Sequence, residues 1–151
     1  MSVTFRNVDV DPSAAVERWP AEAVETAMHR GTLTDWRRFA AAIRISPWSE
    51  LARTVEQVAG WGDDPGVDAL MLAVIERARS DVTAAGRARY AAHVRELRRS
   101  SGLSLRAFAA LAGTSAARLS DYEHARTAPT TDVLTRLEHA AAVAGNRSTP
   151  S

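Results

Sequence analysis

The chain has 151 residues, of which 46% are hydrophobic and 25% charged, so it is long enough for one ordinary domain or two small ones. It contains no cysteine, which excludes disulfides, zinc–thiolate sites and thiol catalysis. The chain has 19 arginines and 18 acidic residues. Residues 1–80 contain 9 of the arginines and 12 of the acidic residues, whereas residues 81–151 contain 10 arginines and 6 acidic residues. An acidic half followed by a basic half indicates two tasks, one of them close to phosphates.

The sequence contains no apolar run near the ~18 residues that a membrane span needs. The first residues, MSVTFRNVDVDP, lack the apolar core of a secretion signal. We therefore expect a cytoplasmic protein without a membrane partner.

Alanine is abundant and strand-like runs are scarce, so the sequence predicts an almost entirely α-helical fold. Residues 3–10 are the one extended candidate, and they form either a loose arm or a strand that pairs with another chain. Apolar residues at helical spacing predict four helices in the first half, over 20–30, 33–45, 46–58 and 67–79. Thr32 and Asp35 predict a capping box at the second of them. Residues 1–80 are thus expected to be a helical domain that dimerises or binds a partner.

Four tryptophans fall in this first half: Trp19, Trp36, Trp48 and Trp61. Either they fill a small helical core, or one or two of them lie on a surface that binds a partner, since tryptophan is enriched at such surfaces.

Ser80 to Gly86 is the candidate boundary between domain 1–80 and domain 81–145. Two interpretations of this junction are open: Asp81 caps a new helix, or one long helix runs through it. Residues 146–151 are predicted to be a disordered polar tail.

Residues 90–143 have the pattern of a helix-turn-helix. One helix is predicted to end near Gly102. Ser104 and Ser115 are placed to cap two short helices, and Gly113 supplies the turn between them. The predicted core side chains are Phe108, Leu119, Tyr122 and Leu137.

These residues resemble the phage-repressor-type (Cro-like, XRE) helix-turn-helix family over residues 89–145. The matching positions are Leu97-Arg98, Gly102-Leu103-Ser104, Phe108-Ala109, Ala112-Gly113-Thr114-Ser115, Leu119-Ser120, Tyr122-Glu123, Arg126 and Pro129. The resemblance implies five short helices, the third of which lies in the major groove of DNA. The expected fold class is therefore all-α, with an N-terminal bundle of about four helices followed by a five-helix Cro-like domain.

The resemblance also implies a DNA-binding surface on and around the third of these helices. Its expected members are Ser104, Arg106, Ser115, Ala116, Ala117, Arg118, Ser120, Asp121, His124 and Arg126. Arg118 is the expected base reader, because a guanidinium pairs bidentately with guanine, and Ala116 and Ala117 would contact thymine methyls. The polar side chains that open the second helix and follow the third would lie near phosphates. Asp121 accepts from cytosine, orients Arg118, or is simply a solvated carboxylate.

Two positions depart from the family pattern. Leu105 stands where the family usually has a glutamine that binds a phosphate, so one anchor is lost. His124 and Ala125 stand where the family often has a basic residue and a glycine, which makes this turn unusual. Glu123 is expected to pair with an arginine inside the fold. Arg98 and Arg99 either touch the DNA backbone or solvate the first helix.

Nothing in the sequence indicates catalysis. The four histidines lack metal-ligand spacing, and the adjacent Asp63 and Asp64 lie in a Gly/Pro-rich turn. There is no glycine-rich phosphate loop. We expect no enzyme activity, no metal and no cofactor.

The sequence therefore predicts a sequence-specific transcriptional repressor that binds double-stranded DNA at a palindromic operator as a homodimer. The alternative is an antitoxin, whose residues 1–80 bind and neutralise a toxin while the C-terminal domain represses the operon of the pair. A third, weaker hypothesis is an adaptor that uses the fold for protein or RNA contacts. A toxin-like reading frame beside this gene would favour the antitoxin.

Overall fold

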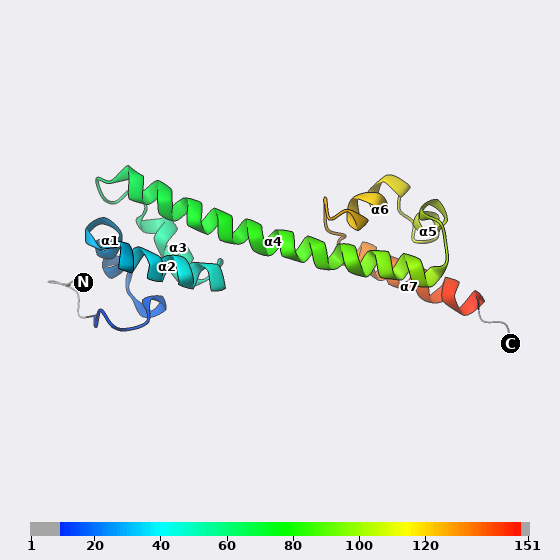
Figure 1. Cartoon of the computed structure of the whole chain (residues 1–151), viewed down its shortest axis with the longest axis horizontal. Coiled ribbons are helices and arrows are strands. Elements are labelled where there is room, and N and C mark those ends of the chain that lie inside the picture. Colours follow the sequence, from blue (N-terminus) through cyan, green and yellow to red (C-terminus); the bar gives the residue numbers. More distant parts are fainter. Residues whose placement is uncertain (1–9, 149–151) are drawn as a thin grey trace. The chain divides into compact units, whose positions relative to one another are not determined.

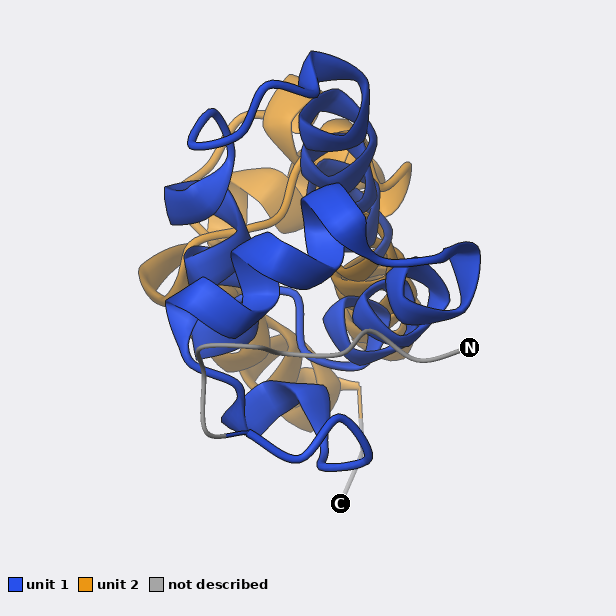
Figure 2. Cartoon of the chain, turned by 90° about the vertical axis from the view of Figure 1, so that its left-hand side faces the viewer, with its two compact units in different colours: residues 1–81 blue, residues 82–151 orange. Residues whose placement is uncertain are grey.

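The computed structural model describes residues 10–148, so most of the expected arm at residues 3–10 lies outside the described residues. Residues 10–148 form one 3₁₀ helix and seven α-helices with no strand among them, which confirms the predicted all-α fold class (Figure 1). The chain divides into two compact units, the first ending at Asp81 and the second beginning at Val82 (Figure 2). Each unit has its own hydrophobic core. Among these helices none has the length and hydropathy that crossing a membrane requires.

The first unit contains the four helices that the sequence predicts for it. Its elements are η1 (Val16–Arg18), α1 (Ala21–Arg30), α2 (Leu33–Ile45), α3 (Glu50–Val58) and the first part of α4 (Pro65–Ser101). Met28, Phe39 and Val55 are fully buried, because each helix turns one apolar face inward. The predicted capping box opens α2, where the backbone N–H of Thr32 donates to the Asp35 carboxylate at 3.0 Å.

Helix α3 begins later than the sequence suggests. The pattern predicts a start at Ser46, but residues 46–49 form a turn, and Oγ of Ser49 accepts the backbone N–H of Ala52 at 3.3 Å. A serine at this position satisfies an otherwise unpaired amide of the first helical turn. Trp48 therefore precedes the helix and is 52% exposed, so the predicted start of this helix at residue 46 is wrong.

Two of the four tryptophans lie in the core of the first unit and two on its surface. Trp19 is 5% exposed and stands edge-on to Phe39, with 5.8 Å between the ring centroids. Trp36 is half-buried and donates from Nε1 to the carbonyl oxygen of Met28 at 3.0 Å. Trp48 and Trp61, in contrast, are 52% and 54% exposed. Two tryptophans thus belong to the core of the first unit and two lie on its surface.

The Ser80–Gly86 junction lies inside a single helix. Helix α4 continues from Pro65 to Ser101, so the long-helix interpretation is confirmed and Asp81 caps nothing. The Asp81 carboxylate instead pairs with Nε of Arg77, one turn earlier, at 3.0 Å. Gly86 is the only glycine between positions 80 and 101, where there is no proline, and a single glycine lowers helix stability without ending a helix.

A buried polar pair joins α1 to α4 within the first unit, and the sequence analysis assigned it no role. Nε2 of His29 lies 3.0 Å from Oδ1 of Asp68, whose Oδ2 accepts the backbone N–H of Gly60 at 2.8 Å. Nδ1 of His29 lies 3.2 Å from a carboxylate oxygen of Glu25. Burial lowers the pKa of His29, but the hydrogen bond and charge of Asp68, with those of Glu25, outweigh burial and raise this pKa above its ordinary value.

We expect the stability of the first unit to fall as the pH rises through the folded-state pKa of His29. Because this pKa is higher in the folded chain, its stabilisation is fully present below the unfolded value of 6.5 and is lost above the folded value. The measurement is the free energy of unfolding of the wild type and of His29→Gln between about pH 5.5 and 8.5, followed by tryptophan fluorescence. The difference between the two chains should shrink as the pH rises. A difference that stays constant with pH would contradict this account.

The second unit contains the rest of α4 together with α5 (Leu105–Leu111), α6 (Ala116–Glu123) and α7 (Thr131–Arg147). The predicted core is confirmed, because Phe108, Leu119 and Leu137 are 0% and Tyr122 7% exposed. These side chains come from α5, α6 and α7 and hold the two short helices against the long ones.

The resemblance implies five helices in this unit, but its described part contains four. Helix α7 is continuous because Val133, Leu137, Ala140 and Ala144 recur at helical spacing along one buried face, with no proline between them. It also includes Asn146 and Arg147, which the sequence analysis places in the tail. Residues 149–151 lie outside the described residues.

Candidate nucleic-acid interface

The helix-turn-helix consists of α5, α6 and the turn between them. Oγ of Ser104 accepts the backbone N–H of Ala107 at 3.2 Å, and Oγ of Ser115 accepts that of Arg118 at 3.1 Å. Both predicted N-caps are therefore confirmed, and each fixes the residue at which its helix starts.

Helix α5 ends in a Schellman turn. The backbone N–H of Thr114 donates to the carbonyl of Ala109 at 3.0 Å, and that of Gly113 donates to the carbonyl of Ala110 at 3.1 Å. These two hydrogen bonds require a left-handed residue at the centre of the motif, and Gly113 adopts φ 69° there. Glycine reaches this conformation without a steric penalty, as the sequence predicts.

Helix α6 ends in the same motif but without a glycine. The backbone N–H of Arg126 donates to the carbonyl of Asp121 at 3.0 Å, and that of Ala125 to the carbonyl of Tyr122 at 3.2 Å. Ala125 has φ 57° and is the only non-glycine residue with positive φ among residues 10–148. The departure from the family pattern at this position thus leaves the turn intact and places a side chain in a conformation that L-residues disfavour.

We expect Ala125→Gly to stabilise the second unit by about 0.5–1 kcal/mol. The left-handed conformation costs an L-residue about 1–2 kcal/mol, from which the extra chain entropy of glycine, about 0.4–1 kcal/mol, is subtracted. Urea unfolding followed by circular dichroism measures the change.

The matched control is Gly113→Ala at the equivalent position of α5. It should destabilise the unit by about 1 kcal/mol or more for two reasons. The alanine must adopt the disfavoured positive φ, and its Cβ would lie 3.0 Å from a guanidinium nitrogen of Arg136. If the two substitutions both raised or both lowered the free energy of unfolding, the result would contradict the shared motif.

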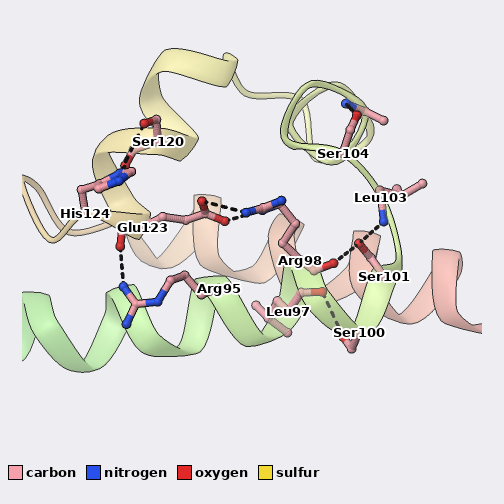
Figure 3. A network of polar contacts seen from close by, with 11 residues as sticks. Arg95, Leu97, Arg98, Ser100, Ser101, Leu103, Ser104, Ser120, Glu123 and His124 are labelled. Carbon is pink, nitrogen blue, oxygen red and sulfur yellow. Dashed lines mark hydrogen bonds and ion pairs between the residues drawn. The ribbon is translucent and has the colours of Figure 1, made fainter.

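A buried carboxylate ties the end of α6 to α4 (Figure 3). Glu123 is 6% exposed, and its two oxygens accept from Nε of Arg98 at 2.6 Å and from Nη2 of the same arginine at 3.3 Å. Arg95 donates to the backbone carbonyl of Glu123. The expected internal pairing of Glu123 is confirmed. Arg98 holds Glu123 inside the fold, which neither expected role of Arg98 describes, whereas Arg99 is exposed and pairs with Glu96 of the same helix.

The residues that the sequence analysis assigns to DNA lie at the start of α5, along α6 and in the turn that follows α6. The exposed ones are Ser104, Arg106, Ser115, Ala117, Arg118, His124 and Arg126, and the half-buried ones are Ala116, Ser120 and Asp121. Ala116 packs against the core of the unit, and so does Leu105, at the position of the missing glutamine. These ten residues are called the α6 surface.

The charged groups of the α6 surface differ in their partners. The side chains of Arg106 and Arg118 make no hydrogen bond or ion pair with any residue between 10 and 148. Asp121 forms no hydrogen bond or ion pair with Arg118 but pairs with Arg126, with 2.9 Å between Oδ1 and Nη1. Nδ1 of His124 lies 2.7 Å from the carbonyl oxygen of Ser120.

Sequence reasoning missed the Asp121–Arg126 pair, because residues five apart do not face one another on a helix. They meet here only because the Schellman turn after α6 reverses the chain. In the sequence, only the residues of this turn indicate that Asp121 and Arg126 meet.

The comparisons with known proteins agree with this geometry. A family model described as a helix-turn-helix domain matches residues 89–147. No curated protein and no solved structure matches the chain. By the family match and by the arrangement of α5, α6 and their turn, residues 89–147 are similar to helix-turn-helix domains, which supports a DNA-binding regulator.

Proposed function

We propose that this protein is a sequence-specific repressor of the phage-repressor type, with α6 as its recognition helix. The observation that carries the proposal is Arg118, an exposed guanidinium on the first turn of α6 without a partner among the described residues. In helix-turn-helix proteins the N-terminal residues of the second helix contact the base edges. The Ser115 cap and the buried Glu123 hold α6 at its two ends.

In this account Arg118 reads a guanine through two hydrogen bonds, while Ala117 and the half-buried Ala116 contact thymine methyls. Arg106 and Ser104, at the start of α5, bind phosphates and set the position of α6 along the groove. Leu105 adds nothing polar at that end, since it packs on the core, so Arg106 supplies most of the anchoring there.

The protein acts as a homodimer in this proposal, and its two α6 helices bind the halves of a palindromic operator. One domain of this size covers only a small part of the DNA surface, and specific sites therefore normally engage two. The first unit, up to Asp81, serves to dimerise the chain or to bind a partner.

A second candidate function is that of an antitoxin, and the exposed tryptophans favour it. Trp48 and Trp61 lie on the surface of the more acidic part of the chain, and Ile45 is 83% exposed nearby in the sequence. Exposed tryptophans of this kind are typical anchors of protein interfaces. Co-purification with the product of the neighbouring gene tests it, and loss of the complex in Trp48→Ala and Trp61→Ala would support it.

We expect Arg118→Ala to weaken binding to the preferred duplex by about 1–3 kcal/mol and to relax base preference at one position. Arg106→Ala should weaken all duplexes alike and reduce the slope of log K against log salt by about 0.9, because it loses one phosphate contact. Fluorescence anisotropy of duplexes selected from a random pool measures both changes. Arg147→Ala, at the end of α7, removes the same charge outside the α6 surface and is the matched control. Equal losses of specificity from Arg118→Ala and Arg106→Ala would contradict these roles.

A further inference from the structure

The α6 surface contains one acidic group, and this group is engaged with one of the three arginines there. Asp121 and Arg126 are joined twice, by the backbone hydrogen bond of 3.0 Å from the Arg126 N–H and by the side-chain ion pair of 2.9 Å. The backbone bond belongs to the Schellman turn, so this turn places Arg126 next to the carboxylate.

This ion pair contributes little to folding. The side chain of Arg126 is 60% exposed and that of Asp121 44%, and exposed ion pairs add only about 0–1 kcal/mol to stability. We therefore expect the pair to affect what the α6 surface binds rather than the stability of the fold. Arg106 and Arg118 are free to meet a polyanion, whereas Arg126 is neutralised by its neighbour.

We propose that Asp121 restrains Arg126 from binding DNA phosphates and so lowers the affinity of the protein for DNA of arbitrary sequence. This inference rests on the proposed function. Non-specific binding is electrostatic, and each arginine that reaches a phosphate releases counterions and adds to affinity whatever the sequence. A phosphate must displace the Asp121 carboxylate before Arg126 can bind it, and the carboxylate itself repels the DNA.

The restraint lowers the affinity for every duplex by a similar factor, whereas base contacts favour only the right one. A preferred site offers Arg118 a guanine, and this contact is unaffected by the Asp121–Arg126 pair. Non-specific DNA offers phosphates alone, so the restraint reduces the electrostatic contribution on which its binding depends entirely. Asp121 thus sets the overall affinity for DNA without contacting a base, and the preference among sequences is left to Arg118 and its neighbours.

The test uses the full chain and a mixed-sequence duplex, so it does not depend on knowing the operator. Asp121→Asn keeps the shape of the side chain but removes its charge. The variant is expected to bind this duplex about three- to tenfold more tightly at low salt, with a slope of log K against log salt steeper by about 0.9. Its thermal unfolding should match that of the wild type.

Two controls separate the restraint from a simple change in net charge. Glu138→Gln removes the same charge on α7, where the carboxylate pairs with His93 of α4, and it should leave binding of the mixed-sequence duplex nearly unchanged. In an Arg126→Gln background, Asp121→Asn should tighten binding by a clearly smaller factor, because only the repulsion between the carboxylate and the DNA is removed and no arginine is released.

The outcomes distinguish this inference from the proposed function. If neither the wild type nor Asp121→Asn binds any duplex, the proposed function fails, and the inference fails with it. If the wild type binds but Asp121→Asn binds no more tightly, the inference alone is overturned. It is also overturned if Asp121→Asn tightens binding equally with and without Arg126, or if it weakens binding to a preferred site only, as the loss of a base contact would.

Discussion

Replacing Trp19 by alanine should destabilise the first unit by about 3–5 kcal/mol, the range for removing a large aromatic side chain from a core. The indole is 5% exposed, stands edge-on to Phe39, and has the guanidinium of Arg38 5.0 Å from its ring centroid. Alanine would leave a cavity beside Phe39 and remove the aromatic and cation–π contacts together. The free energy of unfolding from urea titrations measures the loss.

The exposed tryptophans provide the matched controls. Trp48→Ala and Trp61→Ala should each change the free energy of unfolding by no more than about 0.5 kcal/mol, because surface substitutions rarely do more. In all three variants the remaining tryptophans report on the first unit, since all four precede its end at Asp81. If Trp61→Ala cost as much as Trp19→Ala, the division into core and surface tryptophans would be wrong.

Replacing Glu123 by alanine is expected to destabilise the second unit by about 2–3 kcal/mol. Removing one partner of a buried ion pair costs about 3–5 kcal/mol, and we reduce this range because the side chain of Arg98 is 35% exposed and regains some hydration. Alanine leaves the guanidinium of Arg98 without its two carboxylate acceptors, so that among the described residues only the bond from Arg95 to the backbone carbonyl still joins this end of α6 to α4 by a polar contact.

Glu123→Gln is the informative second variant, because it keeps the length of the side chain and loses only its charge. It should cost less than Glu123→Ala, about 1–2 kcal/mol, since one neutral acceptor remains. Circular dichroism follows the unfolding of both units, while tryptophan fluorescence follows the first unit only and should not change. Equal costs for the two variants would show that the charge of Glu123 contributes nothing.

The elements of the helix-turn-helix were predictable because local chemistry determines them. The serines at 104 and 115 cap α5 and α6 where a side-chain oxygen reaches a free backbone amide, and Gly113 supplies the one left-handed residue of the turn. The spacing of Phe108 and Leu119 identified the buried faces correctly. Each of these signals lies within a few residues of the structure it specifies.

The contacts that the sequence did not predict depend on the tertiary fold. His29 meets Asp68 across 39 positions, and Arg98 meets Glu123 across 25. Helical periodicity carries no information on such distances. For Glu123 the sequence indicated that a partner exists inside the fold but did not identify the arginine.

Two errors arose where competing local signals were close in strength. Pro47 suggested a helix start, but the cap at Ser49 prevails and leaves Trp48 outside α3. The resemblance implied five short helices, but an uninterrupted apolar face makes α7 a single helix, and the described part of the second unit has four. Among the ten residues of the α6 surface, the sequence predicted a set of positions but not that Asp121 and Arg126 pair with one another.

The most direct test of the central claim, that α6 reads DNA sequence, is the recovery of genomic fragments bound by the full chain at low salt. We expect fragments that share an inverted repeat, with half-sites about 10–10.5 base pairs or a multiple of that distance apart. Arg118→Ala should bind genomic DNA without enriching this repeat. Failure of the wild-type protein to retain any duplex at low salt, or retention of fragments without a shared sequence that Arg118→Ala leaves unchanged, would contradict the claim.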